Sequence, residues 1–93
     1  MIRNWRSADA RRIFEGGRPR GFPADLVRSA KRRLELLHQA TTLDDLRAIR
    51  GNRLHPLVGD RAGQWAVRIN DQYRICFRWV EEGAEDVEIV DYH

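Results

Sequence analysis

The 93-residue sequence contains one cysteine, one lysine and three histidines, and its longest apolar stretches are only a few residues. No stretch is long enough to span a bilayer as a helix, and the opening residues lack the apolar segment of a signal peptide. The single cysteine excludes an internal disulfide. A second core could not be built from so short a chain, so we expect one cytosolic domain over residues 1–93.

Metal ligands are too scarce and too dispersed for a structural metal. The three histidines lie far apart in the sequence, and the cysteine stands alone in a strand-like run. Zinc sites need several such ligands at close spacing, so we expect no metal and no cofactor. Residues 59–63 lack the spacing and the lysine of a phosphate-binding P-loop. We interpret Cys76 as a small buried side chain rather than a nucleophile.

Positive charge is abundant and is almost entirely arginine. Sixteen of the seventeen basic residues are Arg, and residues 1–34 carry ten basic against three acidic side chains, whereas residues 78–93 carry one against six. Arginine binds phosphate in a bidentate way and keeps its charge at any working pH. The composition favours a polyanionic partner, although an acidic protein or a merely solvated surface would fit the same counts.

Helical spacing dominates the first half of the chain. Ser7 is expected to cap a short helix that ends at Gly16-Gly17. Apolar residues recurring at helical spacing, after a proline suited to the first turn, predict the longest helix over Pro23–Gln39. Thr42, followed three residues later by an aspartate, matches a capping box. It predicts a further helix that carries Leu43, Leu46 and Ile49.

After Gly51 the apolar residues alternate, which is the spacing of strands. Two strands are predicted over residues 65–69 and 73–79, joined by a tight turn at Asn70-Asp71, because both residue types tolerate a positive φ. A third strand is predicted over residues 87–92, after a turn at Glu82-Gly83, and Ile2–Arg6 resembles another. The pattern predicts an α+β fold in which a mostly antiparallel sheet packs on the helices. The side chains expected against the longest helix are Trp65, Val67, Ile69, Ile75 and Phe77.

The candidates for chemistry are His55 and the run Asp91-Tyr92-His93. RNA cleavage without a metal needs a base for the 2′-hydroxyl proton, an acid for the departing 5′-oxygen, and cations at the phosphorus. Histidine serves both proton-transfer roles because it titrates near neutrality. A histidine before proline is also typical of an ordinary loop, and a terminal one of a frayed end. His38 is expected only to interact with a helix dipole.

Four runs of the sequence form a recognisable set: Gly51–Leu57, Gly59–Gly63, Arg68–Phe77 and Val90–His93. In this order they resemble the HigB toxins of the RelE/ParE superfamily. The resemblance covers essentially the whole chain and implies a RelE-like fold, similar in shape to microbial ribonucleases. It implies the toxin of a type II toxin-antitoxin pair, a ribosome-dependent mRNA endoribonuclease that inhibits translation and leaves 2′,3′-cyclic phosphate ends. It also implies two partners: the ribosome with its mRNA, and a HigA-like helix-turn-helix antitoxin.

The resemblance also implies roles for particular residues. It makes His55 and His93 the proton-transfer residues. Asp91 and Tyr92 would position or assist them, and Arg74 would face the phosphate.

One position departs from the pattern of the family. Some relatives have a lysine at position 58, where this chain has valine. Any charge that is required there must then come from Arg53, Arg61 or Arg74. The basic segment 11–33 would face the ribosome, because each neutralised phosphate releases counterions and strengthens binding. Arg32 and Arg33 are the representatives of that surface.

Two other functions compete with this hypothesis. A gyrase-inhibiting, ParE-like toxin could use the same fold without cleaving RNA, since a fold does not determine a function. The pair of histidines favours the nuclease, because a binding module has no need of them. A nucleic-acid-binding regulator ranks last, because the sequence shows neither a helix-turn-helix nor an aromatic platform.

Overall fold

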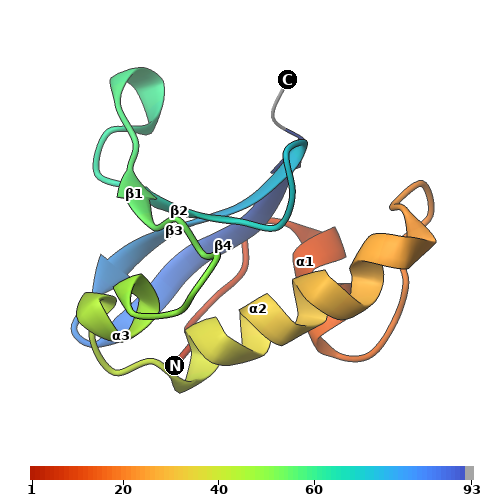
Figure 1. Cartoon of the computed structure of the whole chain (residues 1–93), viewed down its shortest axis with the longest axis horizontal. Helices are drawn as coiled ribbons and strands as arrows, with labels where there is room; N and C mark the ends of the chain where they lie inside the picture. The colour runs from red at the N-terminus through yellow and green to blue at the C-terminus, as the bar shows by residue number, and fades with distance from the viewer. Residues whose placement is uncertain (92–93) are drawn as a thin grey trace.

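The computed structural model describes residues 1–91, which form three α-helices and a four-stranded antiparallel sheet in the order β1-β2-β3-β4. Figure 1 shows α2 crossing one face of the sheet, with α1 beside it. The predicted α+β class is confirmed. The elements are α1 (Ala8–Phe14), α2 (Val27–Gln39), α3 (Leu43–Arg47), β1 (His55–Pro56), β2 (Trp65–Arg68), β3 (Tyr73–Val80) and β4 (Gly83–Asp91).

The predicted helix caps are present. The hydroxyl of Ser7 accepts a hydrogen bond from the amide of Ala10 at 3.1 Å, and Gly16 follows α1 with a φ of 97°. Thr42 and Asp45 form the reciprocal capping box at the start of α3. These side chains satisfy amide groups that the first turn of a helix leaves without a backbone partner.

Two helix boundaries differ from the prediction. Residues Ala24–Leu26 form a 3₁₀ turn, and the α-helix begins only at Val27. Pro23 has a ψ of 126°, which is extended backbone, so it precedes the helix instead of opening it. The short helix α3 ends at Arg47, and Ile49 packs on the core from the turn that follows.

The loop between β2 and β3 lies where it was predicted, but it does not use the predicted left-handed backbone. Neither Asn70 nor Asp71 has a positive φ. The side chain of Asn70 instead accepts hydrogen bonds from the amides of Gln72 and Tyr73, at 3.0 and 2.7 Å. An asparagine side chain can close a turn in this way without left-handed backbone.

The left-handed turn lies at the next connection. Glu81 and Glu82 have φ values of 46° and 65° and join β3 directly to β4, which begins at Gly83 and not at the predicted residue 87. A β-bulge interrupts the alternation of buried and exposed residues along β4, because Phe77 of β3 lies opposite two residues of β4. Ala84 and Val87 are therefore both buried, although their spacing is odd.

The segment Ile2–Arg6 is not the continuous strand that was predicted. It runs parallel to β4 and touches it through two isolated bridges, Ile2 to Ala84 and Trp5 to Val87. Its opening is fixed by His38, whose Nδ1 atom accepts a hydrogen bond from the amide of Ile2 at 3.1 Å. The role predicted for His38 was therefore too narrow, because its imidazole anchors this segment.

The main core lies between the helices and one face of the sheet. Ala30, Leu34 and Leu37 of α2 are fully buried there, as the helical spacing predicted. Trp65, expected to be largely buried, is half-buried at the rim. The strand residues that are buried as predicted are Val67, Ile69, Ile75 and Phe77.

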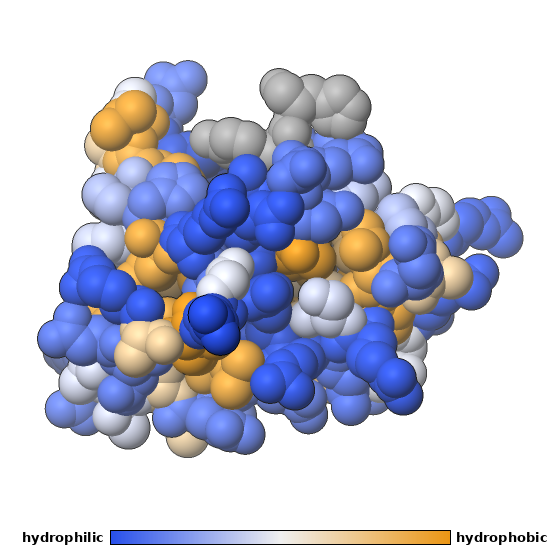
Figure 2. Space-filling model, viewed as in Figure 1, coloured by the Kyte–Doolittle hydropathy of each residue, from blue (hydrophilic) through white to orange (hydrophobic). Residues whose placement is uncertain are grey.

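Strand β1 was not predicted, because two residues cannot display an alternation. His55 pairs with Ala66, and Pro56 with Trp65. Residues 57–64 follow as a lobe that projects from the sheet in Figure 1, and Figure 2 shows hydrophobic atoms at its tip. No helix within residues 1–91 combines the length and the apolar character that crossing a membrane requires.

Candidate active site

The pairing of the strands places His55 on the face of the sheet opposite α1 and α2, here called the outer face. His55 of β1 pairs with Ala66 of β2, Ala66 with Cys76 of β3, and Cys76 with Glu88 of β4. Paired residues point to the same side, so these four side chains form one row across the sheet. His55 is exposed at the open end of that row.

A second row on the outer face contains two arginines. Arg68 of β2 pairs with Arg74 of β3. Arg68 forms a 2.5 Å ion pair with Asp71 in the intervening turn. Arg74 donates from Nη1 to the carbonyl oxygens of Asn70 and Tyr73. Like charges placed opposite each other in a sheet repel, so an anion bound beside this row would reduce the repulsion.

The imidazole of His55 has a defined orientation. Its Nδ1 atom lies 2.9 Å from the carbonyl oxygen of Arg53, two residues earlier. A carbonyl oxygen can only accept, so Nδ1 donates the hydrogen bond and Nε2 is left to take up a proton. Arg53 has a φ of 48°, and this left-handed backbone turns its carbonyl toward the ring.

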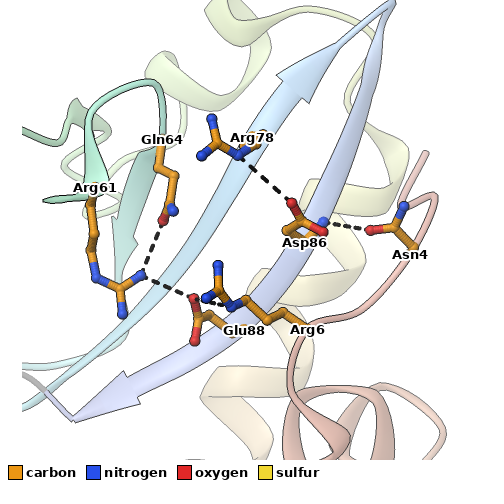
Figure 3. A network of polar contacts seen from close by, with 7 residues as sticks. All are labelled: Asn4, Arg6, Arg61, Gln64, Arg78, Asp86 and Glu88. Carbon is orange, nitrogen blue, oxygen red and sulfur yellow. Dashed lines mark hydrogen bonds and ion pairs between the residues drawn. The ribbon is translucent and has the colours of Figure 1, made fainter.

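Arg61 points across the outer face toward β4 (Figure 3). Its Nη1 atom donates to Gln64 at 3.1 Å and to Glu88 at 3.0 Å. Glu88 also pairs with Arg6 at 3.8 Å, and its side chain is only 15% exposed. One carboxylate thus stands between two guanidinium groups, which leaves this part of the outer face positive.

Arg33 reaches the edge of the sheet from α2. Its Nη1 atom donates to the side chain of Asn52 at 2.5 Å, and Asn52 is 2% exposed. Burial lowers the pKa of Arg33, and the nearby charges of Arg68 and Arg32 lower it further. Arg32 itself is exposed, whereas Arg33 is half-buried and is held in place by Asn52.

Asp91 does not join His55 and Arg74. It pairs with Tyr73 and therefore lies on the helix-side face, where it lines a cavity of about 240 Å³ together with Tyr73 and Phe22. Its carboxylate accepts a hydrogen bond from Gln72 at 3.2 Å. Tyr92 and His93, the other two predicted residues of this run, lie outside the described residues.

Two further positions can be placed. Cys76 is fully buried, and burial raises the pKa of its thiol, which confirms that it is a core side chain. Val58, the position at which some relatives have a lysine, lies in the lobe with 84% of its surface exposed, and as a valine it brings no charge to the outer face. Within residues 1–91, no three His, Cys, Asp or Glu side chains gather closely enough to hold a metal ion.

Three residues that organise this region were not predicted as site residues. Asn52 was only part of a motif, yet it binds Arg33. Arg68 was also only part of a motif, and it lies beside Arg74. Glu88 was counted as part of an acidic segment, although it holds Arg61. Contacts of this kind join residues on different segments, so they can be recognised only once the pairing of the strands is known.

An antiparallel sheet backed by two helices, with a histidine and several arginines on its open face, agrees with the fold that the resemblance to RelE-like toxins implies. The sequence matches, over residues 3–93, the family described as "RelE-like toxin of type II toxin-antitoxin system HigB", and the chain belongs to this family. The resemblance drawn from its motifs is confirmed.

Two curated relatives agree with this assignment. The chain is 34% identical over 94 aligned positions to the endoribonuclease HigB of Proteus vulgaris, and the alignment covers all of both chains. It is 39% identical over 64 positions to toxin HigB-1 of Vibrio cholerae, which covers 69% of this chain and 67% of that one.

Proposed function

We propose that this toxin is a metal-independent mRNA endoribonuclease that acts in the cytoplasm on mRNA held by the ribosome. The observation that carries the proposal is the outer face, where an oriented imidazole lies on the same side of the sheet as Arg68 and Arg74. The name of the Proteus relative, an endoribonuclease, supports it. Inhibition of translation follows from the loss of mRNA.

His55 is the proposed general base. Its Nδ1 atom is engaged by the Arg53 carbonyl, so Nε2 receives the proton of the 2′-hydroxyl. The 2′-oxygen then attacks the adjacent phosphorus, and the P–O5′ bond breaks. His93 is assigned as the acid that protonates the departing 5′-oxygen. The products are a 2′,3′-cyclic phosphate and a 5′-hydroxyl end.

The arginines supply the positive charge that the reaction needs. The pentacoordinate phosphorane carries more negative charge than the bound phosphate, so fixed cations stabilise it selectively. Arg74 is assigned to this role because hydrogen bonds to the turn hold its guanidinium in place on the outer face. Arg61, fixed by Glu88, and Arg53 bind the flanking RNA.

Asp91 is proposed as a positioning residue. Its carboxylate lies on the helix-side face and holds Gln72, so it fixes the end of β4 directly before Tyr92 and His93 in the chain. Tyr92 is proposed to assist His93.

The proposed partners are the ribosome, its mRNA and a HigA-like helix-turn-helix antitoxin that neutralises the toxin. Arg32, which is exposed on α2, contributes to the ribosome-facing surface. Arg33, fixed by Asn52, contributes charge to the edge of that surface.

The test is cleavage of a defined mRNA by the purified chain, with and without ribosomes. We expect cleavage with ribosomes and little without them. Intact mRNA in both reactions, together with inhibition of DNA gyrase, would replace the nuclease with the ParE-like alternative.

A further inference from the structure

Three arginines lie around Asp71 at the edge of the outer face, and a fourth, Arg33, lies near one of them. Arg68 pairs with Asp71 directly, and the charges of Arg53 and Arg74 lie close enough to contribute to the lowered pKa of that carboxyl. Arg33 lies close enough to Arg68 for the two charges to repel. In Figure 2, strongly hydrophilic side chains gather around the β2–β3 turn, with some hydrophobic surface between them and α2.

Buried Asn52 holds two of these arginines in place. Its side-chain oxygen accepts a hydrogen bond from Arg33, and its backbone oxygen accepts one from the amide of Arg68 at 2.7 Å. Its own amide group donates to the carbonyl of Leu46 at 3.3 Å. Asn52 therefore fixes the guanidinium of Arg33 and the backbone of Arg68 in the same framework.

The two guanidinium groups have hydrogen-bonding capacity left over. The Nε atoms of Arg33 and Arg68 are both buried, and neither has a partner among the described residues. Burying an unpaired donor of a charged group is costly. Such donors call for an explanation, and an anion bound at the exposed parts of the two side chains would offset the cost of burying them.

The position of Asp71 indicates what that ligand is. The side chain of Asp71 is 96% exposed, whereas that of its partner Arg68 is 25% exposed, so the carboxylate rests on the outside of the cluster. A carboxylate and a phosphate share negative charge and the paired oxygens that a guanidinium binds. An exposed ion pair is also weak, so it can be exchanged at little cost.

We propose that Arg33 and Arg68, held by Asn52, form a binding site for a phosphate of an RNA strand, and that Asp71 occupies this site in the free protein until the phosphate displaces it. The choice of RNA rests on the proposed function. The site lies on the same outer face as His55, and Arg53, whose carbonyl holds the imidazole, is close enough to Asp71 for their charges to interact. It would hold a phosphate next to the one that is cleaved.

If Asp71 competes with RNA for this site, removing its carboxylate should strengthen the binding of RNA. Asp71→Asn removes the competitor and should tighten binding of RNA by about two- to fivefold at low salt, the range expected for one exposed ion pair. Arg68→Gln should weaken binding by about tenfold and reduce the slope of log Kd against log salt by about 0.7, the loss of one contact to single-stranded RNA.

The experiment measures the affinity of the full chain for a short fluorescent 2′-O-methyl RNA across a salt series. This RNA lacks the attacking hydroxyl, so binding is observed without cleavage. Asp44→Asn and Arg47→Gln are the matched controls, because Asp44 and Arg47 form an exposed pair with the same sequence spacing at 2.8 Å. These controls change the net charge equally and should alter the affinity only slightly.

The double variant Arg68→Gln/Asp71→Asn decides whether the acid acts through Arg68. We expect no gain from Asp71→Asn once Arg68 is absent. A gain that persists without Arg68, or one no larger than that of Asp44→Asn, would overturn the site. Thermal unfolding checks each variant, and the exposed position of Asp71 keeps the test available if Arg68→Gln folds poorly.

Sedimentation with ribosomes separates the two sources of phosphate. A gain on free RNA assigns the site to the mRNA strand, a gain on ribosomes alone assigns it to ribosomal RNA, and no gain on either overturns it. The mRNA cleavage assay remains independent: a chain that binds RNA with the Asp71→Asn gain but cuts no mRNA would retain the site and lose the proposed nuclease function.

Discussion

The imidazole of His55 is held by the backbone of Arg53, through a 2.9 Å hydrogen bond from Nδ1 to the carbonyl oxygen. The left-handed backbone of Arg53 makes this contact possible between residues only two positions apart. The contact fixes both the tautomer and the direction of the ring before any RNA is bound. A base that is oriented in advance loses less freedom when the substrate arrives.

Replacing the imidazole of His55 should remove most of the mRNA cleavage activity while lowering the stability of the fold only slightly. We expect His55→Ala to lower single-turnover cleavage of ribosome-bound mRNA by about 10² to 10⁴, the usual contribution of a general base. Deleting His93 should lower it by about 10² or more. His38→Gln is the control, because it loosens the anchor of Ile2 but leaves the outer face intact. Unchanged cleavage by His55→Ala would remove this residue from the mechanism.

The buried side chain of Asn52 should contribute more to the free energy of unfolding than the side chain of Asn4, which bonds in an exposed position. Asn52→Ala leaves a buried end of Arg33 and the carbonyl of Leu46 without their partner, so the free energy of unfolding should fall by about 1–3 kcal/mol. Asn4→Ala removes a hydrogen bond in an exposed position and should cost less than about 1 kcal/mol. Urea titrations of the two variants provide the measurement, and equal losses would contradict the framework role of Asn52.

The capping box gives stability a defined pH dependence. Hydrogen bonds from the amide and hydroxyl of Thr41, and from the amide of Thr42, hold the pKa of Asp45 below its usual value. A lowered folded pKa stabilises the protein above the unfolded value, and that stability is lost as pH falls through the folded pKa. Asp45→Asn should therefore lower Tm at neutral pH, and its deficit should shrink below about pH 4.

Thermal unfolding followed by circular dichroism at neutral and acid pH measures this difference. Asp44→Asn is the control, because the carboxylate of Asp44 accepts a hydrogen bond from Arg47 and takes no part in the box. An Asp45→Asn deficit of the same size at both pH values would show that the carboxylate charge is not what stabilises the cap.

The ribosome-facing surface should be tested at exposed arginines. Reversing the charge of Arg33 would also disturb the fold, because Arg33 is bonded to buried Asn52. Arg28→Glu/Arg32→Glu avoids that problem, because both side chains are exposed on α2. We expect weaker sedimentation with ribosomes and a salt slope flatter by about 1 for each lost phosphate contact.

Arg47→Glu/Arg50→Glu provides the matched reversal for this surface. Both side chains are exposed on or just after α3, and the pair changes the net charge by the same amount. Equal effects from the two double variants would show that total charge, and not the α2 surface, governs association with ribosomes.

The predictable part of this protein is the part governed by local chemistry. Ser7 and Thr42 cap helices as expected, and Val67, Ile75 and Phe77 are buried as their alternation indicates. These features depend on neighbours within a few residues, which the sequence displays directly.

The rest depends on register and on contacts between distant segments. The bulge opposite Phe77 moved the start of β4 away from its apparent place. The pairing of Tyr73 with Asp91 put that acid on the face opposite His55, where a motif of consecutive residues had suggested a common site. The contact between Arg33 and Asn52 joins positions 19 residues apart, which spacing alone could not reveal.

The chemistry of the cut ends tests the central claim most directly. Ribosome-bound mRNA is incubated with the toxin at an EDTA concentration that leaves the ribosomes intact. The ends of both mRNA fragments are then identified by mass spectrometry. Attack by the neighbouring 2′-oxygen predicts a 2′,3′-cyclic phosphate upstream and a 5′-hydroxyl downstream, with no cleavage where the nucleotide at the cut carries 2′-deoxyribose. A 3′-hydroxyl with a 5′-phosphate, or cleavage that stops in EDTA, would contradict the two-histidine mechanism and point to a metal-activated water.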